Sequence, residues 1–257
     1  MTDLSRPWPL GLDENRWWAT AGGALALLAV ALAFDRPLSL WAQSWPEAVR
    51  VALAEITPYG ESGWILYPSG VLFAATAILA LVVRRKLIRL LLWQFAELFG
   101  FFFAGVGLPS LIATLSKRLI GRGRPSHYDD TGLFGVHWNW LDWTYQSFPS
   151  GHATTAFALA AVIGFVSERW FYPVLAFASV MAVSRVALGV HYPSDVVGGA
   201  LLGLIGAYFV RWVFARRGWM FRFDAAGRIA MRPTSSLKRV LALRRRSSAG
   251  APRPGRP

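Results

Sequence analysis

The chain has 257 residues, 54% of them hydrophobic, and a formal net charge of +13. This apolar fraction exceeds that of ordinary water-soluble domains. A soluble nucleic-acid-binding protein would be basic without such a high apolar content, so we expect no nucleic-acid partner. The chain contains no Cys, which excludes disulfides, thiolate nucleophiles and metal sites with sulfur ligands.

Six apolar runs predict six transmembrane helices, since a helix needs about 20 residues to cross a bilayer. The fourth run is short for this purpose unless its polar start lies in the interface. We expect an all-α fold: a polytopic membrane helix bundle in residues 1–232, then a disordered basic cytoplasmic tail in residues 233–257 that lies against anionic membrane lipids. The six predicted spans are residues 17–34, 64–83, 90–115, 153–167, 171–189 and 196–214.

Three features of the first half leave alternatives open. The first run has a second interpretation as a cleaved signal peptide, because the sequence ALA at 31–33 resembles a cleavage site. Residues 44–57 place apolar side chains on one helical stripe, which predicts an interfacial helix that either connects two spans or shapes a lateral entrance for lipid. Glu97 is an intramembrane acid about 30 Å along a helix from Lys117, too far to share a ligand with it, and we expect a structural hydrogen bond.

The distribution of Lys and Arg predicts that both termini are cytoplasmic, because 20 of the 27 basic residues then lie on that side of the membrane. In this arrangement the connections 116–152 and 189–196 lie side by side on the outer face, which is periplasmic in a bacterial inner membrane. These two connections and the adjoining helix ends hold nearly all the chemistry.

The cations Lys117, Arg124 and Arg185 lie near the ends of apolar runs, where an unpaired charge is costly. The stretch Pro149–His152 precedes a helical run. Gly151 lets backbone approach a ligand closely there, and free N–H groups at the helix start attract anions. Three cations and helix N-termini on one face predict a site for an anion with several oxygens. Phosphate fits this description.

Two histidines beside that anion indicate catalysis. A neutral His191 can attack phosphorus while Asp195, four residues later, holds the other ring nitrogen. His152 can protonate the leaving oxygen and then deprotonate the attacking water. The cations stabilise the transferring phosphoryl group, so the prediction needs no metal and no cofactor.

The sequence resembles the type 2 phosphatidic acid phosphatase superfamily, which includes vanadium haloperoxidases. The pattern Lys-x6-Arg-Pro begins at Lys117, Pro-Ser-Gly-His ends at His152, and Ser-Arg-x5-His-x3-Asp covers residues 184–195. All three parts are complete, in order, and have the family's internal spacings. The resemblance implies that His191 is the nucleophile, Asp195 its orienting partner and His152 the general acid and base.

The same resemblance implies that five residues bind the substrate phosphate: Lys117, Arg124, Arg185, Ser150 and the Gly151 N–H. We therefore predict a metal-independent lipid phosphatase that acts on a lipid phosphate or diphosphate through a phosphohistidine intermediate. Candidate substrates are undecaprenyl diphosphate, lipid A phosphate groups, phosphatidylglycerophosphate and phosphatidic acid, and an outward-facing site favours the first two. The alternatives are a phosphotransferase, vanadate-dependent halide oxidation, which six spans disfavour, and a non-enzymatic lipid-phosphate binder, which the intact histidines disfavour.

The connection 126–148 is long and aromatic, and it has two interpretations. It is either an aromatic belt at the membrane interface or a lid over the site that contacts the substrate. Its cluster of His127, Asp129 and Asp130 matches no familiar metal-ligand spacing, so we predict no metal site there.

Overall fold

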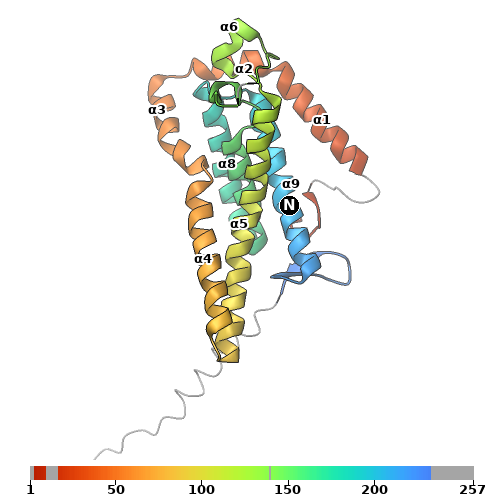
Figure 1. Ribbon diagram of the computed structural model, residues 1–257. Helices are drawn as coiled ribbons and strands as arrows, with labels where there is room; N and C mark the ends of the chain where they lie inside the picture. Colours follow the sequence, from red (N-terminus) through yellow and green to blue (C-terminus); the bar gives the residue numbers. More distant parts are fainter. Residues whose placement is uncertain (1–2, 10–16, 139, 233–257) are drawn as a thin grey trace, which may run out of the picture.

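The computed structural model describes residues 3–9, 17–138 and 140–232 (Figure 1). The predicted disordered tail, residues 233–257, lies outside the described residues. The described chain is mostly helical, with 3-10 turns (η) and one small hairpin. Its elements are α1 (Trp17–Ala33), α2 (Asp35–Gln43), α3 (Glu47–Ile56), η2 (Thr57–Gly60), α4 (Gly63–Val82), α5 (Lys86–Ile120), η3 (Pro125–His127), α6 (Tyr128–Thr131), η4 (Trp143–Tyr145), α7 (Gly151–Val166), η5 (Glu168–Trp170), α8 (Phe171–Ala187), α9 (Pro193–Arg217), β1 (Phe221–Phe223) and β2 (Ile229–Met231).

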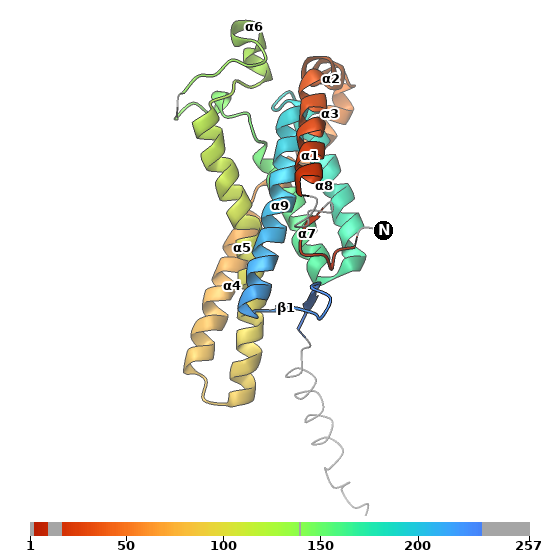
Figure 2. The ribbon, with the colours of Figure 1, turned by 90° about the vertical axis from the view of Figure 1, so that its right-hand side faces the viewer.

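Helix α7 lies at the centre of the bundle and packs against α5, α8 and α9, while α4 runs antiparallel along α5 (Figure 2). The core of the bundle is aromatic: Phe101 of α5 is fully buried and packs edge-on against Phe214 of α9. Because α7 is surrounded by other helices, most of its side chains are buried. Its first turn therefore begins inside the protein and not at a lipid-facing surface.

Glycines let α9 approach α7 and α5 closely. A Cβ at Gly199 or Gly203 would collide with backbone carbonyl oxygens of Ser150 and Thr154, respectively. A Cβ at Gly206 would lie 2.7 Å from the ring of Pro109 in α5. Small residues commonly allow such close helix contacts in membranes. The distance between α7 and α9 is consequently limited by contact between the backbones of the two helices.

The prediction of six spans is not confirmed. Among the described residues, four helical segments are long and apolar enough to cross a bilayer: Glu47–Val82, Lys86–Ile120, Glu168–Ala187 and Pro193–Arg217. A fifth is reached if α1 and α2 count as one span, although their axes are bent by 57°. The fourth predicted span corresponds to α7, which has only 16 residues, fewer than a bilayer core requires.

The hairpin follows the end of α9 that points away from α6 and pairs with the N-terminal segment, whereas α4 and α5 extend further in that direction (Figure 2). Glu97 accepts a hydrogen bond of 2.8 Å from the backbone N–H of Met220, between α9 and β1. Arg211 is buried in α9, donates to the backbone carbonyls of Leu4 and Arg6, and lies 4.0 Å above the Phe165 ring. The expected structural hydrogen bond of Glu97 is thus confirmed, and its partner is the backbone that follows α9.

Candidate active site

Four of the predicted site residues come from the ends of four different helices. Lys117 lies in the last turn of α5, His152 in the first turn of α7, Arg185 in the last turn of α8 and Asp195 in the first turn of α9. His191 lies in the short bend between α8 and α9. The structure therefore brings both connections to one place, as the alternation of spans predicts.

The carboxylate of Asp195 is completely buried and closely surrounded by donors. Its Oδ2 lies 3.5 Å from His191 Nδ1 and accepts hydrogen bonds from Ser147 Oγ (2.5 Å) and the Tyr192 N–H (2.9 Å). Its Oδ1 accepts a hydrogen bond of 2.6 Å from Arg122 Nη1. Asp195 also caps α9, which begins at Pro193. These contacts fix the carboxylate in one orientation beside the imidazole.

The imidazole of His191 is almost fully buried, at 1% exposure. Burial lowers its pKa to about 4, although the hydrogen bond and charge of Asp195 oppose this shift. The ring is therefore neutral at pH 7. Because Nδ1 faces Asp195, the nitrogen left for a ligand is Nε2, which is the arrangement that a histidine nucleophile requires.

The three predicted phosphate-binding cations lie within electrostatic range of one another. A Cβ at Gly151 would lie 3.0 Å from Lys117 Nζ, so the absence of a side chain lets the ammonium approach the start of α7. Arg185 Nη1 donates a hydrogen bond of 3.1 Å to Thr57 Oγ1. Burial, and secondarily the charge of Arg185, lowers the pKa of Arg124 to about 10, which leaves its guanidinium protonated at pH 7.

His152 lies against the turn η2, where a Cβ at Gly60 would lie 2.5 Å from the imidazole Cδ2. The same turn begins with Thr57, which accepts the hydrogen bond from Arg185. The turn η2 thus forms one wall of the site. A helix is found in residues 44–57, as predicted, and it is α3; its location at the membrane interface stays a prediction. The contact of the following turn with His152 and Arg185 was not predicted.

Four polar atoms of the predicted site are buried and have no hydrogen-bond partner among the residues that the structure describes: Arg124 Nε, Ser150 Oγ, His152 Nε2 and Arg185 Nε. Buried polar groups are nearly always paired. The Gly151 and His152 N–H groups also belong to the first turn of α7, which has no intrahelical acceptors for them. These groups are suited to bind the oxygens of a tetrahedral anion.

The sequence-based analysis missed Arg122 and Asp35. Arg122 is buried, and its guanidinium joins two buried carboxylates, Asp195 at 2.6 Å and Asp35 at 2.8 Å. Asp35 begins α2 and also accepts hydrogen bonds from the N–H and Oγ of Ser194. From the sequence alone, Arg122 was one of several outer basic residues. The only signal for Asp35 was an acidic residue directly after an apolar run.

The connection from α5 to α7 positions these side chains through backbone pairing. The N–H of Arg124 donates to the Thr144 carbonyl, and the Ser147 N–H donates to the Arg122 carbonyl. Its aromatic side chains are mostly exposed: Trp138, Trp140 and Trp143 are each at least 60% exposed. The ring of Trp143 lies 4.6 Å from the guanidinium of Arg124, so the aromatic segment contacts the site directly.

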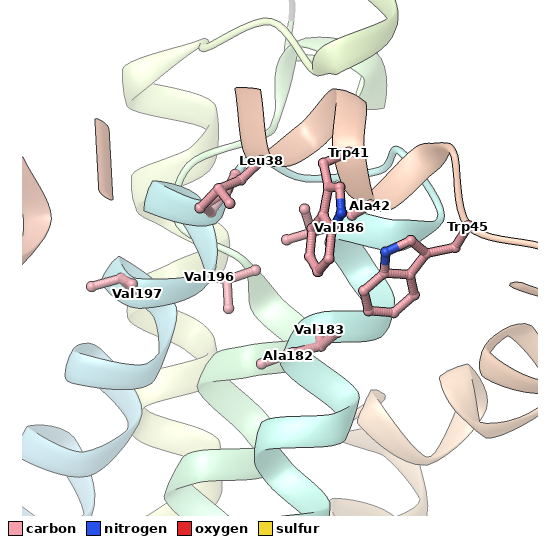
Figure 3. A pocket seen from close by; sticks show the side chains of 10 residues that line it. Leu38, Trp41, Ala42, Trp45, Ala182, Val183, Val186, Val196 and Val197 are labelled. Atoms are coloured by element: carbon pink, nitrogen blue, oxygen red, sulfur yellow. The ribbon is translucent and has the colours of Figure 1, made fainter. Parts of the chain in front are cut away.

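An apolar groove of about 240 Å³ lies between α2, α8 and α9 (Figure 3). Trp41 of α2 and Trp45 just after α2 face it from one side, and Ala182, Val186 and Val196 face it from the bundle. Its remaining lining residues are Leu38, Ala42, Val183, Pro193 and Val197. Val186 and Val196 directly follow Arg185 and Asp195 in the chain, so the groove borders the elements that build the site.

Comparisons with known proteins show which family this chain resembles. The family model described as the PAP2 superfamily matches residues 97–219. The chain is 33% identical to lipid A 1-phosphatase of Rhizobium johnstonii, over 87% of this chain and 93% of that one. It is 32% identical to lipid A 1-phosphatase of Rhizobium etli, over 82% and 91% of the two chains. The crystal structure of Aquifex aeolicus LpxE is similar with a TM-score of 0.48 and 23% identity, covering 69% of this chain and 94% of that one.

Proposed function

We propose a reaction and a substrate for this chain, which belongs to the PAP2 superfamily and is one of its membrane lipid phosphatases. The reaction is hydrolysis of a phosphate ester, and the substrate is lipid A, from which one phosphate group is removed. The observation that carries the reaction is the buried His191–Asp195 pair beside buried polar groups that lack partners among the described residues. Lipid A is proposed because the two rhizobial relatives that match over most of their length carry its name.

The proposed mechanism has two steps. In the first, His191 Nε2 attacks phosphorus, the bond from phosphorus to the lipid oxygen breaks, and His152 donates a proton to that oxygen. Asp195 accepts a hydrogen bond from Nδ1–H and stabilises the positive imidazole ring. In the second, His152 removes a proton from water, the water oxygen attacks phosphorus, and the nitrogen–phosphorus bond breaks to release inorganic phosphate.

The cations act on the phosphate during both steps. Arg124 and Arg185 can each donate two parallel hydrogen bonds to phosphate oxygens, whereas Lys117 contributes a point charge. The two arginines already contact Thr57 and Trp143, and charges positioned in advance are how a protein stabilises phosphoryl transfer without reorganisation. The start of α7 adds N–H donors from Gly151 and His152.

A lipid substrate is supported by the groove between α2, α8 and α9. Its lining is apolar and lies next to the helix ends that carry Arg185 and Asp195. We propose that part of an acyl chain lies in this groove while the phosphorylated head group enters the site. The phosphate would then be hydrolysed at the membrane surface without extraction of the lipid.

The proposed location is a bacterial inner membrane, with both termini in the cytoplasm and the site toward the periplasm. The run of basic residues at 84–89 lies at the start of α5, and Lys117 lies near its other end. Basic connections favour the cytoplasmic side, which supports an outward-facing site.

We expect chelators to leave the activity unchanged, because the proposed nucleophile is a side chain and three cations already surround the phosphate. A divalent cation would be repelled by Lys117, Arg124 and Arg185. The measurement is phosphate release by purified protein before and after dialysis against EDTA. A loss of activity that added Mg²⁺ or Zn²⁺ restores would contradict the metal-free mechanism.

The experiment that tests the proposed function is phosphate release in detergent from a panel of lipid phosphates: lipid A, undecaprenyl diphosphate, phosphatidylglycerophosphate and phosphatidic acid. Lipid A is expected to be hydrolysed fastest, with one phosphate lost per molecule by mass spectrometry. Faster hydrolysis of another panel member would overturn the choice of lipid A. A phosphorylated acceptor in place of free phosphate would identify the same site as a phosphotransferase, and no turnover of any lipid would overturn the function.

A further inference from the structure

Behind the predicted nucleophile lies a line of buried charges that the proposed mechanism does not yet use. It runs from Asp35 through Arg122 to Asp195, with ion-pair distances of 2.8 Å and 2.6 Å. The side chains of both aspartates are 0% exposed and that of Arg122 is 7% exposed. These residues come from α2, the connection after α5 and the first turn of α9, so three separate parts of the chain meet at this line.

Arg122 differs from the arginines assigned to the phosphate. Its Nε donates to the Leu133 carbonyl, its Nη1 to Ser194 and Asp195, and its Nη2 to Asp35. Each of its three nitrogens thus donates to protein, whereas the Nε atoms of Arg124 and Arg185 have no partner among the described residues. The bonded guanidinium of Arg122 is therefore directed at carboxylates and not at substrate.

The charges along this line do not cancel. Two carboxylates face one guanidinium, which leaves one negative charge in a region shielded from water. The Tyr192 ring lies 4.6 Å from the guanidinium and adds no charge. Lys117 and Arg124 also lie within electrostatic range of Asp195, but their charge is balanced by the phosphate when substrate binds. The remaining negative charge matches the positive charge that develops on His191 as it attacks phosphorus.

We infer that Asp35 and Arg122 are positioning residues for the proposed reaction: Arg122 fixes the Asp195 carboxylate, and Asp35 offsets the charge of Arg122 so that Asp195 can stabilise a positive His191. This inference rests on the proposed function and adds two residues to its machinery. Without Asp35, the guanidinium would compete with the imidazole ring for the charge of Asp195. The effect is therefore expected in the chemical step and not in binding.

The test is steady-state kinetics of Asp35→Asn and Asp35→Glu in the full-length protein, on the panel lipid that the wild type hydrolyses fastest. Asp35→Asn keeps the shape of the side chain and removes its charge. We expect kcat to fall about tenfold, the size of effect seen when a residue that orients a metal-binding side chain is lost, with KM nearly unchanged. Asp35→Glu keeps the charge and is expected to retain more activity. A purely structural role predicts the reverse order, because Asn fits the site better than Glu.

The matched control is Asp129→Asn, which removes the same charge from an exposed side chain that pairs only loosely with Arg36, at 3.7 Å. If Asp35→Asn is folded and as active as this control, the positioning role is wrong. If Asp35→Asn does not give folded protein, Arg122→Lys replaces it: a single ammonium cannot hold both carboxylates, so kcat should again fall about tenfold at similar KM, and an unchanged kcat overturns the role. A wild type without turnover would contradict the proposed function itself.

Discussion

Replacement of His191 by alanine is expected to lower the rate of phosphate release by about 10⁴-fold or more, because the attacking atom is removed. The buried Asp195 and the three cations remain, so the variant should still bind substrate or vanadate. The measurement is kcat on the best lipid substrate, together with trapping of phosphate on the protein as an acid-labile, alkali-stable adduct in the wild type.

The matched control for this change is His137→Ala, which removes an exposed imidazole from the connection between α5 and α7. This variant should keep most of the wild-type rate. Both proteins are compared by gel filtration and thermal unfolding, so that loss of fold is separated from loss of chemistry. A His191→Ala variant that is folded and retains near-normal turnover would remove the proposed nucleophile.

Replacement of His152 by alanine should have an effect that depends on the leaving group. For a lipid substrate, whose departing oxygen needs a proton, the rate is expected to fall about 10²- to 10⁴-fold, the range for loss of a general acid. For an aryl phosphate such as nitrophenyl phosphate, whose departing oxygen is stable as an anion, formation of the intermediate should be much less affected. The measurement is single-turnover release of the alcohol and of nitrophenol.

The slower second step provides the internal check on His152. Without the base that activates water, the phosphorylated form of the variant should accumulate when nitrophenyl phosphate is the substrate. If the rate falls equally for both substrates and the phosphorylated protein does not accumulate, His152 is not the acid and base. That result would indicate a residue that only binds phosphate.

The sequence predicts well what depends on local spacing. His191 and Asp195 are four residues apart at a helix start, so their contact follows from one bend of the chain. The common location of Lys117, His152 and Arg185 follows from alternating helix direction. Runs of apolar residues predict the helices, because a helix that is buried or in contact with lipid needs apolar side chains.

What the sequence does not predict depends on contacts between distant segments. Asp35 meets Arg122 across 87 residues, and Arg122 meets Asp195 across 73, and nothing in the local sequence separates Arg122 from the nearby Arg124. The number of spans was not predictable for a related reason: α7 is apolar because other helices surround it, and apolarity alone does not distinguish a protein interior from lipid.

The glycines of α9 have a consequence for specificity. Because Gly199 and Gly203 place α9 directly on backbone atoms of α7, the two helices that carry the proposed catalytic groups His152 and Asp195 have little room to move relative to each other. We therefore expect discrimination between lipids to arise from the tryptophan-rich segment after Arg124 and from the mouth of the apolar groove. Substitutions in this segment and at the mouth of the groove, with α7 and α9 left unchanged, are thus the way in which we expect substrate selectivity to be altered.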